Sequence, residues 1–381
     1  MARDINRRLT SLNARRRGTD RLNRVRTDDA VELIRKSAIT EAYQKRSTAS
    51  KPNTRYALGA MQEVSPEYTR ISIETAERVG RQLHQGLTSA GFGIEFRLQG
   101  SVPLNTHIRG VSDVDLLNLS TSFFTYATSG ARSRAGLYQN PSLQTSLQVL
   151  GALRRESEKI LKAAYPAVTV DTSGSKAIQL SGGSLARPVD VVPSHWHDTI
   201  GYQTTYLEHD RGVTILDRSV PETVDNLPFL HIKRVKDRDV LALGSLKKAI
   251  RLCKNVKSDA EEEGINITLG SYDIAAILYH ADLAALQAGS LYELGILAEA
   301  QRYLDWLYHN KAEAQKLIVP DGSRRIFDSQ DKLNGLLHLS VQLDELMKEV
   351  GGEQNILLRL LDAPSLQQSR DAVSSLYIPA A

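Results

Sequence analysis

Residues 94–119 have the sequence IEFRLQGSVPLNTHIRGVSDVDLLNL, and this stretch decides the fold. The apolar alternation from Ile94 to Leu98 predicts a strand that ends at a Gly-Ser pair, and a second strand-like run contains Asp113 and Asp115. Residues two apart on a strand point to the same side, so both carboxylates project together. Burying such a pair among apolar neighbours is unfavourable unless a cation lies between them.

The turn before these acids suits a phosphate group. Gly100 lets the backbone approach a ligand closely, and Ser101 with the following N–H groups, near a helix start, can hold phosphate oxygens. Magnesium prefers oxygen ligands and shares them with substrate phosphates, so the stretch predicts a metal–nucleoside triphosphate site. A second Asp-x-Asp, at Asp237 and Asp239, lies among charged residues in KRVKDRDV, and we interpret it as a solvated surface or turn.

A third acid lies on another predicted strand. Residues 187–194, RPVDVVPS, form an apolar run whose one acidic residue is Asp190. Two-metal phosphoryl transfer uses about three carboxylates to hold two ions roughly 3.5–4 Å apart, where one ion activates the attacking hydroxyl and the other holds the triphosphate and the leaving pyrophosphate. We therefore predict Asp113, Asp115 and Asp190 as catalytic residues that hold two Mg²⁺ ions, with Mn²⁺ as the alternative ion.

A Gly-Ser pair, an Asp-x-Asp on the next strand and a single Asp on a later strand resemble the DNA polymerase β-like nucleotidyltransferases. Within that superfamily, VDVVP around Asp190 resembles the CD-NTases, the cGAS/DncV-like bacterial enzymes that make cyclic nucleotide signals in anti-phage (CBASS) defence. The resemblance runs from about residue 60 to about residue 350. It implies an α+β fold, with a polymerase β-like nucleotidyltransferase core, a small mixed sheet, a long spine helix and a C-terminal all-helical lobe.

The same resemblance assigns further residues to the nucleotide. Residues 246–256, LKKAIRLCKNV, form a basic amphipathic helix in which the family places Lys254 on the triphosphate, while we interpret most of its cations as a solvated face. The family also places Ser271 on the triphosphate and stacks Tyr272 on a base, although Ser271 also suits a helix N-cap and Tyr272 the core. The predicted nucleotide-binding residues are Gln99, Gly100, Ser101, Lys254, Ser271 and Tyr272.

The N-terminal segment, residues 1–26, is rich in arginine and contains more than the chain's whole net charge of +4. Clustered arginines can bind nucleic acid by neutralising phosphates. Apolar residues such as Leu9 and Leu12 equally suit a helix packed against the rest of the chain. Because few aromatic residues are available for base stacking, we favour the structural interpretation and expect that nucleic acid is not required.

Composition excludes several other classes of protein. The 381 residues are 41% hydrophobic, which suits a large core. They contain neither an apolar run of about 18 residues nor a signal-peptide pattern, so we expect no membrane contact and a cytoplasmic location. The single cysteine, Cys253, excludes an intrachain disulfide and a cysteine zinc cluster. Residues 195–198, HWHD, have His-x-His spacing but lack further zinc ligands, and we interpret them as packing or a polar rim.

The pattern of helices and strands divides the chain into a basic N-terminal helical segment (1–60), a catalytic core (61–230) and a helical lobe (231–381). Ser65 and Pro66 predict the start of the spine helix, which extends to about Ser89. Leucine-rich segments, ILLRLL among them, are interpreted as the core of the lobe, and the C-terminal tail as flexible. Other predicted elements are a helix from Asp28 to about Lys45, loops at 47–54 and 120–142, a helix at 143–164, and strands at 168–171, 177–180 and 187–192.

These implications predict a Mg-dependent cyclic oligonucleotide synthase. It would join nucleoside triphosphates, ATP, GTP or others, into a cyclic di- or trinucleotide and release pyrophosphate. The implied partner is a product-sensing effector protein, and Ala380-Ala381 is compatible with a regulatory or conjugating partner at the C-terminus. Two alternatives stay open. One is a template-independent RNA or tRNA nucleotidyltransferase, which uses the same three acids, and the other is a catalytically silent RNA-binding module.

Overall fold

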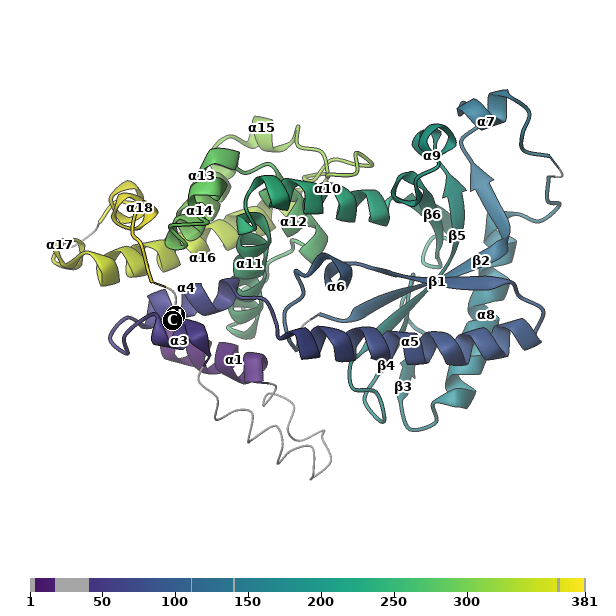
Figure 1. Cartoon of the computed structure of the whole chain (residues 1–381), viewed down its shortest axis with the longest axis horizontal. Helices are drawn as coiled ribbons and strands as arrows, with labels where there is room; N and C mark the ends of the chain where they lie inside the picture. Colours follow the sequence, from purple (N-terminus) through teal and green to yellow (C-terminus); the bar gives the residue numbers. More distant parts are fainter. Residues whose placement is uncertain (1–3, 18–40, 111, 140, 362–363, 380–381) are drawn as a thin grey trace. The chain divides into compact units, whose positions relative to one another are not determined.

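The computed structural model describes residues 4–17, 41–110, 112–139, 141–361 and 364–379 (Figure 1). The chain forms two compact units. The sheet unit comprises Ser65–Leu104 and Asp113–Arg234, and the helical unit comprises Met1–Val64, Asn105–Ser112 and Val235–Ala381. The loop 105–112, between the Gly-Ser pair and the acid pair, therefore belongs to the helical unit, whereas the residues on either side of it belong to the sheet unit.

The sheet unit is built on one mixed sheet of seven strands, where a small mixed sheet was expected. The strand order is β1-β2-β5-β4-β3, and β6 and β7 continue from β5. Strands β2 and β5 are parallel, whereas the other pairs are antiparallel. The strands are β1 (Ile94–Gln99), β2 (Val114–Tyr126), β3 (Thr169–Asp171), β4 (Ile178–Ser181), β5 (Val189–Asp198), β6 (Gly212–Asp217) and β7 (Glu222–Asn226).

Two strands are longer than predicted. Strand β2 continues to Tyr126, so the loop predicted after Leu119 is wrong over this stretch. Strand β5 likewise continues to Asp198. After a register shift between Ser120 and Phe124, the two extensions pair with each other, so tertiary pairing has extended a segment whose serines and threonines suggested a loop. Strands β6 and β7 were not predicted.

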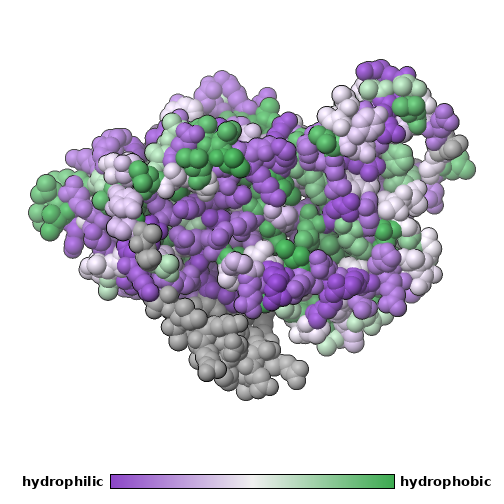
Figure 2. Space-filling view, in the orientation of Figure 1, coloured by the Kyte–Doolittle hydropathy of each residue, from purple (hydrophilic) through white to green (hydrophobic). Residues whose placement is uncertain are grey.

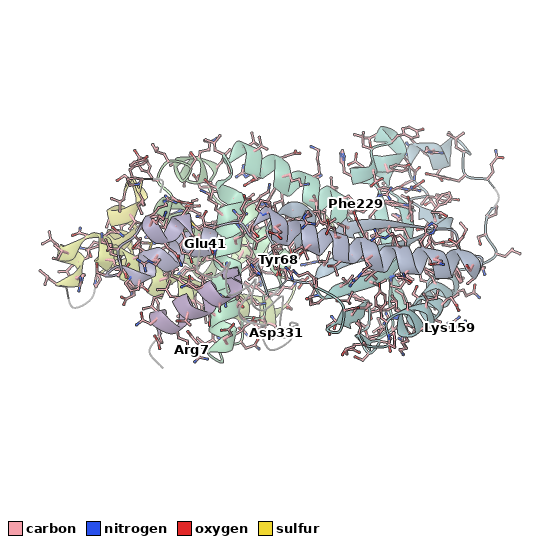
Figure 3. All side chains as sticks on the ribbon, turned by 60° about the horizontal axis from the view of Figure 1, so that its bottom comes forward. Arg7, Glu41, Tyr68, Lys159, Phe229 and Asp331 are labelled. Atoms are coloured by element: carbon pink, nitrogen blue, oxygen red, sulfur yellow. The ribbon has the colours of Figure 1, made fainter. Side chains whose placement is uncertain are left out.

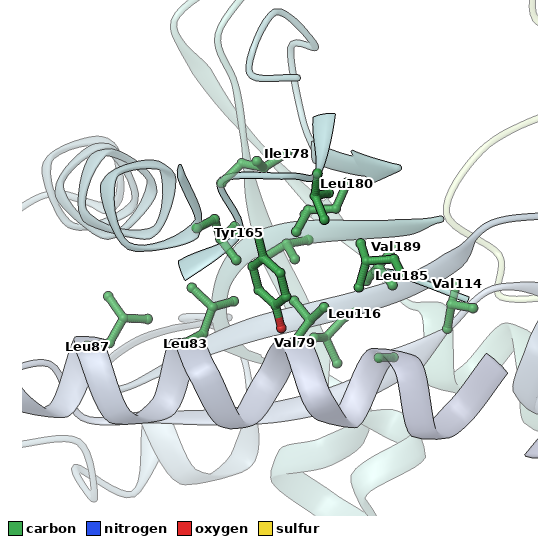
Figure 4. Close-up of a cluster of buried hydrophobic side chains, with 14 of the residues drawn as sticks. Val79, Leu83, Leu87, Val114, Leu116, Tyr165, Ile178, Leu180, Leu185 and Val189 are labelled. Carbon is green, nitrogen blue, oxygen red and sulfur yellow. The ribbon is translucent and has the colours of Figure 1, made fainter. Parts of the chain in front are cut away.

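Two long helices pack on one face of the sheet, α5 (Pro66–Ser89) and α8 (Ser146–Ala164). The predicted spine helix is confirmed as α5: Ser65 caps it by accepting from the Tyr68 N–H, and Pro66 occupies its first turn. Val114 and Leu116 of β2 face these helices (Figure 4). The core contains, among others, Val79, Leu83, Leu87, Leu153, Tyr165, Ile178, Leu180, Val189 and Val191.

The sheet unit also has short helical segments at its loops. These are α6 (Ser101–Leu104), α7 (Ala131–Arg134), α9 (Ile200–Thr205) and the 3₁₀ segment η2 (Glu208–Asp210), while α10 (Pro228–Leu241) continues into the helical unit. The other helices of the helical unit are α1 (Ile5–Arg17), α3 (Ala42–Lys45), α4 (Pro52–Met61), α11 (Ser245–Glu262), α12 (Ser271–Tyr279), α13 (Leu283–Ala288), α14 (Leu294–His309), α15 (Lys311–Ala314), α16 (Gln330–Gln354), α17 (Ile356–Arg359) and α18 (Leu366–Ser374).

The arginine-rich N-terminal helix α1 packs within the helical unit through buried ion pairs. Arg8 is 1% exposed and bonds Glu263, and Arg15 is 5% exposed and bonds Asp259 at 2.6 Å. These contacts support the structural interpretation for the described part of this segment. Most of the helix predicted from Asp28 lies outside the described residues. Helix α4 begins at Pro52, inside the stretch predicted as a loop, because proline suits the first turn of a helix.

Two predictions about the C-terminal region are wrong. Helix α17 was expected to be core, yet only Leu358 among its leucines is buried, whereas Ile356 and Leu357 are 70% and 67% exposed. Figure 2 shows a hydrophobic surface at the position of α17, at the far left of the view. The tail is also held at least to Pro379, because Arg46 donates hydrogen bonds to the carbonyls of Ile378 and Pro379. No helix among the described residues is both long and apolar enough to cross a bilayer.

Candidate active site

Four polar side chains form a row across four neighbouring strands. Gln99 on β1 is the register partner of Asp115 on β2, Asp115 is the partner of Asp190 on β5, and Asp190 is the partner of Gln179 on β4. Register partners on adjacent strands project from the same face. Leu116, the neighbour of Asp115, packs on α5 and α8, so the row faces away from those helices.

Asp113 lies one residue before β2 begins, so the prediction that it is part of the strand is wrong. Its carboxylate is still close enough to Asp190 to act on it. Burial is the main cause that raises the pKa of Asp190 to about 6, and repulsion from the Asp113 carboxylate is the second. Strand register therefore sets Asp115 beside Asp190, and the effect on the pKa of Asp190 shows that Asp113 lies within electrostatic range of it.

Gln179 is a residue of the site that sequence reasoning missed. Its side-chain amide donates a hydrogen bond of 3.3 Å to Asp190 Oδ2, which favours the charged carboxylate and partly opposes the rise in its pKa. The alternation of Ile178, Gln179 and Leu180 places the two apolar side chains in the core and the amide on the opposite face. That alternation was available in the sequence, but the partner of Gln179 depended on strand order.

Gly100 has a positive φ of 76°, a backbone conformation that residues with a Cβ adopt with strain. A Cβ on Gly100 would also overlap Asp115 Oδ2. Ser101 follows as the first residue of α6, and Val102 and Leu104 of that short helix are buried. The predicted Gly-Ser turn thus lies directly against one of the predicted acids.

The chemistry of this face fits a divalent cation. A carboxyl pKa raised by burial and by a second carboxylate is the effect that a bound cation would relieve, and the predicted ligands are all oxygen donors. Within the described residues, no three His, Cys, Asp or Glu side chains already stand in an arrangement that could hold a metal ion.

Lys254 lies in the helical unit and is 4% exposed. Its ammonium group donates to the Thr106 carbonyl at 2.9 Å and to Ser112 Oγ at 3.3 Å, both in the loop 105–112. Arg251, one turn earlier on α11, is also buried. Arg251 is therefore not part of a solvated face, which was expected for most cations of this helix.

Ser271 and Tyr272 begin α12 in the helical unit. The N-cap is Gly270, so the alternative that Ser271 caps the helix is wrong, and Ser271 is exposed in the first turn. The Tyr272 hydroxyl donates to Asp321, and Arg324 lies over its ring at 5.3 Å. Burial and the hydrogen bond to Asp321 raise the pKa of Tyr272.

The second Asp-x-Asp and the His-x-His pattern, both interpreted as non-catalytic, make contacts within the fold. Asp239 lies in α10, is 6% exposed and accepts a hydrogen bond from the Lys247 N–H, so its assignment to a solvated surface or turn is wrong. Asp237, in the same helix, is exposed. His195 is fully buried with its ring against Phe123, and His197 bonds Thr125 at 2.9 Å. Neither pattern lies in the row that contains Asp115 and Asp190.

A hollow of about 350 Å³ lies between α5 and β1, away from the acids. Its lining includes Gly80 and Arg81 of α5 and Phe96, Leu98 and Leu116 of the sheet. Because Leu116 and Asp115 are sequence neighbours on β2, their side chains leave opposite faces. The hollow is therefore separate from the candidate active site.

A family model and two related proteins match this chain. A family model described as the cGAS/DncV-like nucleotidyltransferase C-terminal helical domain matches residues 233–341. The chain is similar to the cyclic dinucleotide synthase CdnE of Yersinia aleksiciae, at 40% identity over 354 residues that cover 90% of this chain and 91% of that protein. It is also similar to a c-di-GMP synthase of Lachnospiraceae bacterium (strain RUG226), at 30% identity over 70% of this chain and 80% of that protein.

Solved structures show the same fold. The chain is similar to a STING-associated CdnE c-di-GMP synthase from Capnocytophaga granulosa, with a TM-score of 0.66 and 27% sequence identity. The superposition covers 90% of this chain and 97% of that structure. The predicted fold class, an α+β core with a small mixed sheet and a helical C-terminal region, is confirmed.

Proposed function

This chain belongs to the cGAS/DncV-like nucleotidyltransferases, as its motifs predicted, and on that premise we propose that it joins nucleoside triphosphates into a cyclic di- or trinucleotide and releases pyrophosphate. The observation that supports this most is the register of Asp115 and Asp190 on parallel strands, with Asp113 acting on Asp190. The similarity to cyclic dinucleotide synthases favours this activity over template-independent tailing of RNA.

We assign the metal and the proton transfer to the three acids. Asp113, Asp115 and Asp190 would hold two Mg²⁺ ions, and bound magnesium lowers the pKa of the attacking ribose hydroxyl and offsets the charge of the triphosphate. Asp190 would lie nearest the attacking hydroxyl and help to remove its proton, directly or through the metal. The hydroxyl oxygen bonds to the α-phosphorus, and pyrophosphate leaves with the electron pair of the broken P–O bond. A second attack closes the ring.

The nucleotide-binding assignments rest on the resemblance of the motifs. Gly100 and Ser101, with Gln99 at the end of β1, would hold the triphosphate on the sheet unit. Lys254 and Ser271 would also hold the triphosphate, and Tyr272 would stack on a base. In this proposal, residues 61–230 are the catalytic core and residues 231–381 the helical lobe. A product-sensing effector and a cytoplasmic location belong to the same proposal.

The test is incubation of the purified chain with all four nucleoside triphosphates and Mg²⁺, followed by phosphatase treatment and mass spectrometry. We expect a phosphatase-resistant product whose mass matches a cyclic di- or trinucleotide. GTP alone is the first substrate to try, because the Lachnospiraceae relative is a c-di-GMP synthase. A parallel reaction with a short RNA primer separates the alternative: a tailing enzyme would lengthen the primer. Phosphatase would remove the terminal phosphates of a linear product, whereas a cyclic product has no terminal phosphate to lose. The absence of any product would overturn the proposal.

A further inference from the structure

The row of polar side chains on the sheet continues beyond Gln179. The register partner of Gln179 on β3 is Asp171, so the row crosses five strands, from β1 to the hairpin formed by β3 and β4. The apolar side chains of this hairpin pack into the core, and its alternate side chains lie on the face of the acids. All four of these alternate side chains are polar: Thr169, Asp171, Gln179 and Ser181.

Gln179 is exposed and lies next to Asp190 in this row. Its side-chain amide donates one hydrogen bond, of 3.3 Å, to Asp190 Oδ2. An amide group has a second N–H donor and a carbonyl oxygen that accepts. Within the described residues these two groups have no side-chain or backbone partner, so they are open to a ligand that lies beside Asp190.

A buried arginine holds the turn between the two strands of the hairpin. Arg154 of α8 is 2% exposed, and its guanidinium donates to the carbonyls of Gly174 at 2.6 Å, Ser175 at 3.0 Å and Ala177 at 3.2 Å. Ala177 directly precedes β4. A binding group is placed precisely only where the element that carries it is itself held by its surroundings. Arg154 therefore fixes the start of the strand that carries Gln179.

Along the strands, the same face is closed beyond the acids. Val192 lies two residues after Asp190 on β5, and Leu117 lies two residues after Asp115 on β2, so these side chains share one face. Val192 and Leu117 belong to a buried apolar cluster, and Phe229, which Figure 3 labels, packs against it. The polar surface beside Asp190 therefore extends across the strands, toward β4.

We propose that Gln179 binds the acceptor nucleotide through the ribose hydroxyl next to the attacking one, and so selects ribonucleotides over deoxyribonucleotides. The inference rests on the proposed function, in which the triphosphate lies at Gly100 and Ser101 and the attacking hydroxyl at Asp190. In the strand order, Gln179 lies on the other side of Asp190 from that turn. An amide can donate to a hydroxyl and accept from it, and a site built to bind a hydroxyl rejects the analogue that lacks it.

The test separates the two nucleotides of the first joining step. A 2′,3′-dideoxynucleoside triphosphate has no hydroxyl to attack with and acts only as the donor. An α,β-methylene analogue cannot transfer its α-phosphate and acts only as the acceptor. The base is the one that the wild type uses, with guanine tried first. The acceptor is supplied intact, as its 2′-deoxy form and as its 3′-deoxy form, and the deoxy form that still reacts lacks only the neighbouring hydroxyl.

Three variants of the full-length chain are compared with the wild type. Gln179→Ala removes the amide, and Gln179→Met removes it but keeps a long side chain. Val170→Ala is the matched control, because Val170 lies in the same hairpin but packs into the core on the opposite face. The kcat/KM for the acceptor is measured at saturating donor, and the thermal midpoint is recorded. Calorimetry with Mg²⁺ measures the binding of each acceptor analogue without donor.

In the wild type, removal of the neighbouring hydroxyl should lower kcat/KM for the acceptor about 5- to 10-fold, as for the loss of one hydrogen bond. Gln179→Ala should cause a similar loss with the intact acceptor. Removal of the hydroxyl should then change kcat/KM less than about twofold, because both changes remove the same contact. The KM for the donor should stay within about twofold. Val170→Ala should keep the full discrimination even where its thermal midpoint falls.

Undiminished discrimination against the deoxy acceptor in Gln179→Ala and Gln179→Met would overturn the proposal, and so would equal use of both acceptors by the wild type. Loss of discrimination in Val170→Ala to the same extent would also overturn it, since the order of the hairpin would then explain the effect. If neither deoxy form reacts, calorimetry makes the same comparison.

If the wild type makes no product from any acceptor, the proposed function fails, and binding of the analogues decides the role of Gln179 by itself. Weaker binding of one deoxy form to the wild type but not to Gln179→Ala would support the contact with a ribose hydroxyl. Equal binding of all forms, or no binding, would reject it.

Discussion

Asp115 Oδ2 lies so close to Gly100 that a Cβ atom on this residue would overlap it, and Gly100 itself has a positive φ of 76°. The turn that is predicted to hold phosphate and the acid that is predicted to hold metal are therefore packed directly against each other. A side chain at position 100 would affect both the backbone of the turn and the direction of the Asp115 carboxylate.

Gly100→Ala should therefore remove activity as well as stability. The left-handed backbone conformation alone costs a residue with a Cβ about 1–2 kcal/mol of unfolding free energy. Gly91→Ala is the control, because Gly91 has a φ of 86° with nothing within 4 Å of an added Cβ. Denaturant unfolding should show similar losses for both variants, whereas product formation should be lost only in Gly100→Ala. Equal activity in the two variants would contradict the role given to this contact.

Asp115→Asn and Asp190→Asn should each lower product formation by more than about 100-fold, since loss of an outer-shell partner of a metal site alone costs up to that factor. Asp237→Asn changes the exposed acid of the Asp-x-Asp in α10 and should retain wild-type activity. Initial rates at saturating nucleotide and Mg²⁺ provide the measurement. Substantial activity in Asp190→Asn would remove this residue from the catalytic set.

The raised pKa of Asp190 predicts a pH dependence in the metal-free protein. Its value of about 6, against 3.8 for an ordinary aspartate, means that the folded state binds this proton more tightly than the unfolded state. Stability should therefore fall as the pH rises from about 4 to 6, and the deficit should persist above 6. In the presence of EDTA, Asp190→Asn should be more stable than the wild type at pH 7, with a smaller difference at pH 4. Thermal midpoints at the two pH values give the comparison.

The same pKa predicts competition between protons and metal. Below about pH 6 the Asp190 carboxyl takes up a proton and loses affinity for a cation. Mn²⁺ binding followed by calorimetry should weaken as the pH falls through this value. In Asp113→Asn the decline should move to lower pH, because repulsion from Asp113 is one cause of the shift. A decline that stays at the same pH would show that burial alone raises the pKa.

Cys253 should be inert in the folded protein. It lies fully buried in α11, and burial raises the pKa of its thiol to about 12, so almost no thiolate exists near neutral pH. A chromogenic disulfide reagent at pH 8 should react with it only after unfolding, and the reaction should follow the denaturant transition. Rapid labelling of the native protein would contradict the burial of α11.

The exposed apolar surface of α17 provides a matched pair of leucines. Leu358 is 6% exposed and Leu357 is 67% exposed. Leu358→Ala should lower the unfolding free energy by about 2 kcal/mol or more, as for other buried leucines. Leu357→Ala should change it by no more than about 0.5 kcal/mol, as for other surface substitutions. Similar losses from both would mean that Leu357 is covered in solution.

The sequence by itself determined the local pieces of this protein. A serine and a proline at 65–66 placed the start of the spine helix, and a glycine at 100 placed the end of β1, because helix capping and positive φ depend on single residues. Acids among apolar residues marked Asp113, Asp115 and Asp190 as candidates, because burial of a charge is unfavourable wherever the chain folds. These inferences needed no knowledge of strand order.

Only the tertiary structure decided which pieces meet. The register between β2 and β5 sets Asp115 beside Asp190, and the next strand sets Gln179 there as well, since strand pairing joins residues far apart in sequence. Arg251 is buried on a basic helix, and α17 is exposed although it is rich in leucine, because neighbouring elements decide what a helix face contacts. Amphipathic spacing describes a helix face, but packing partners determine whether that face is covered.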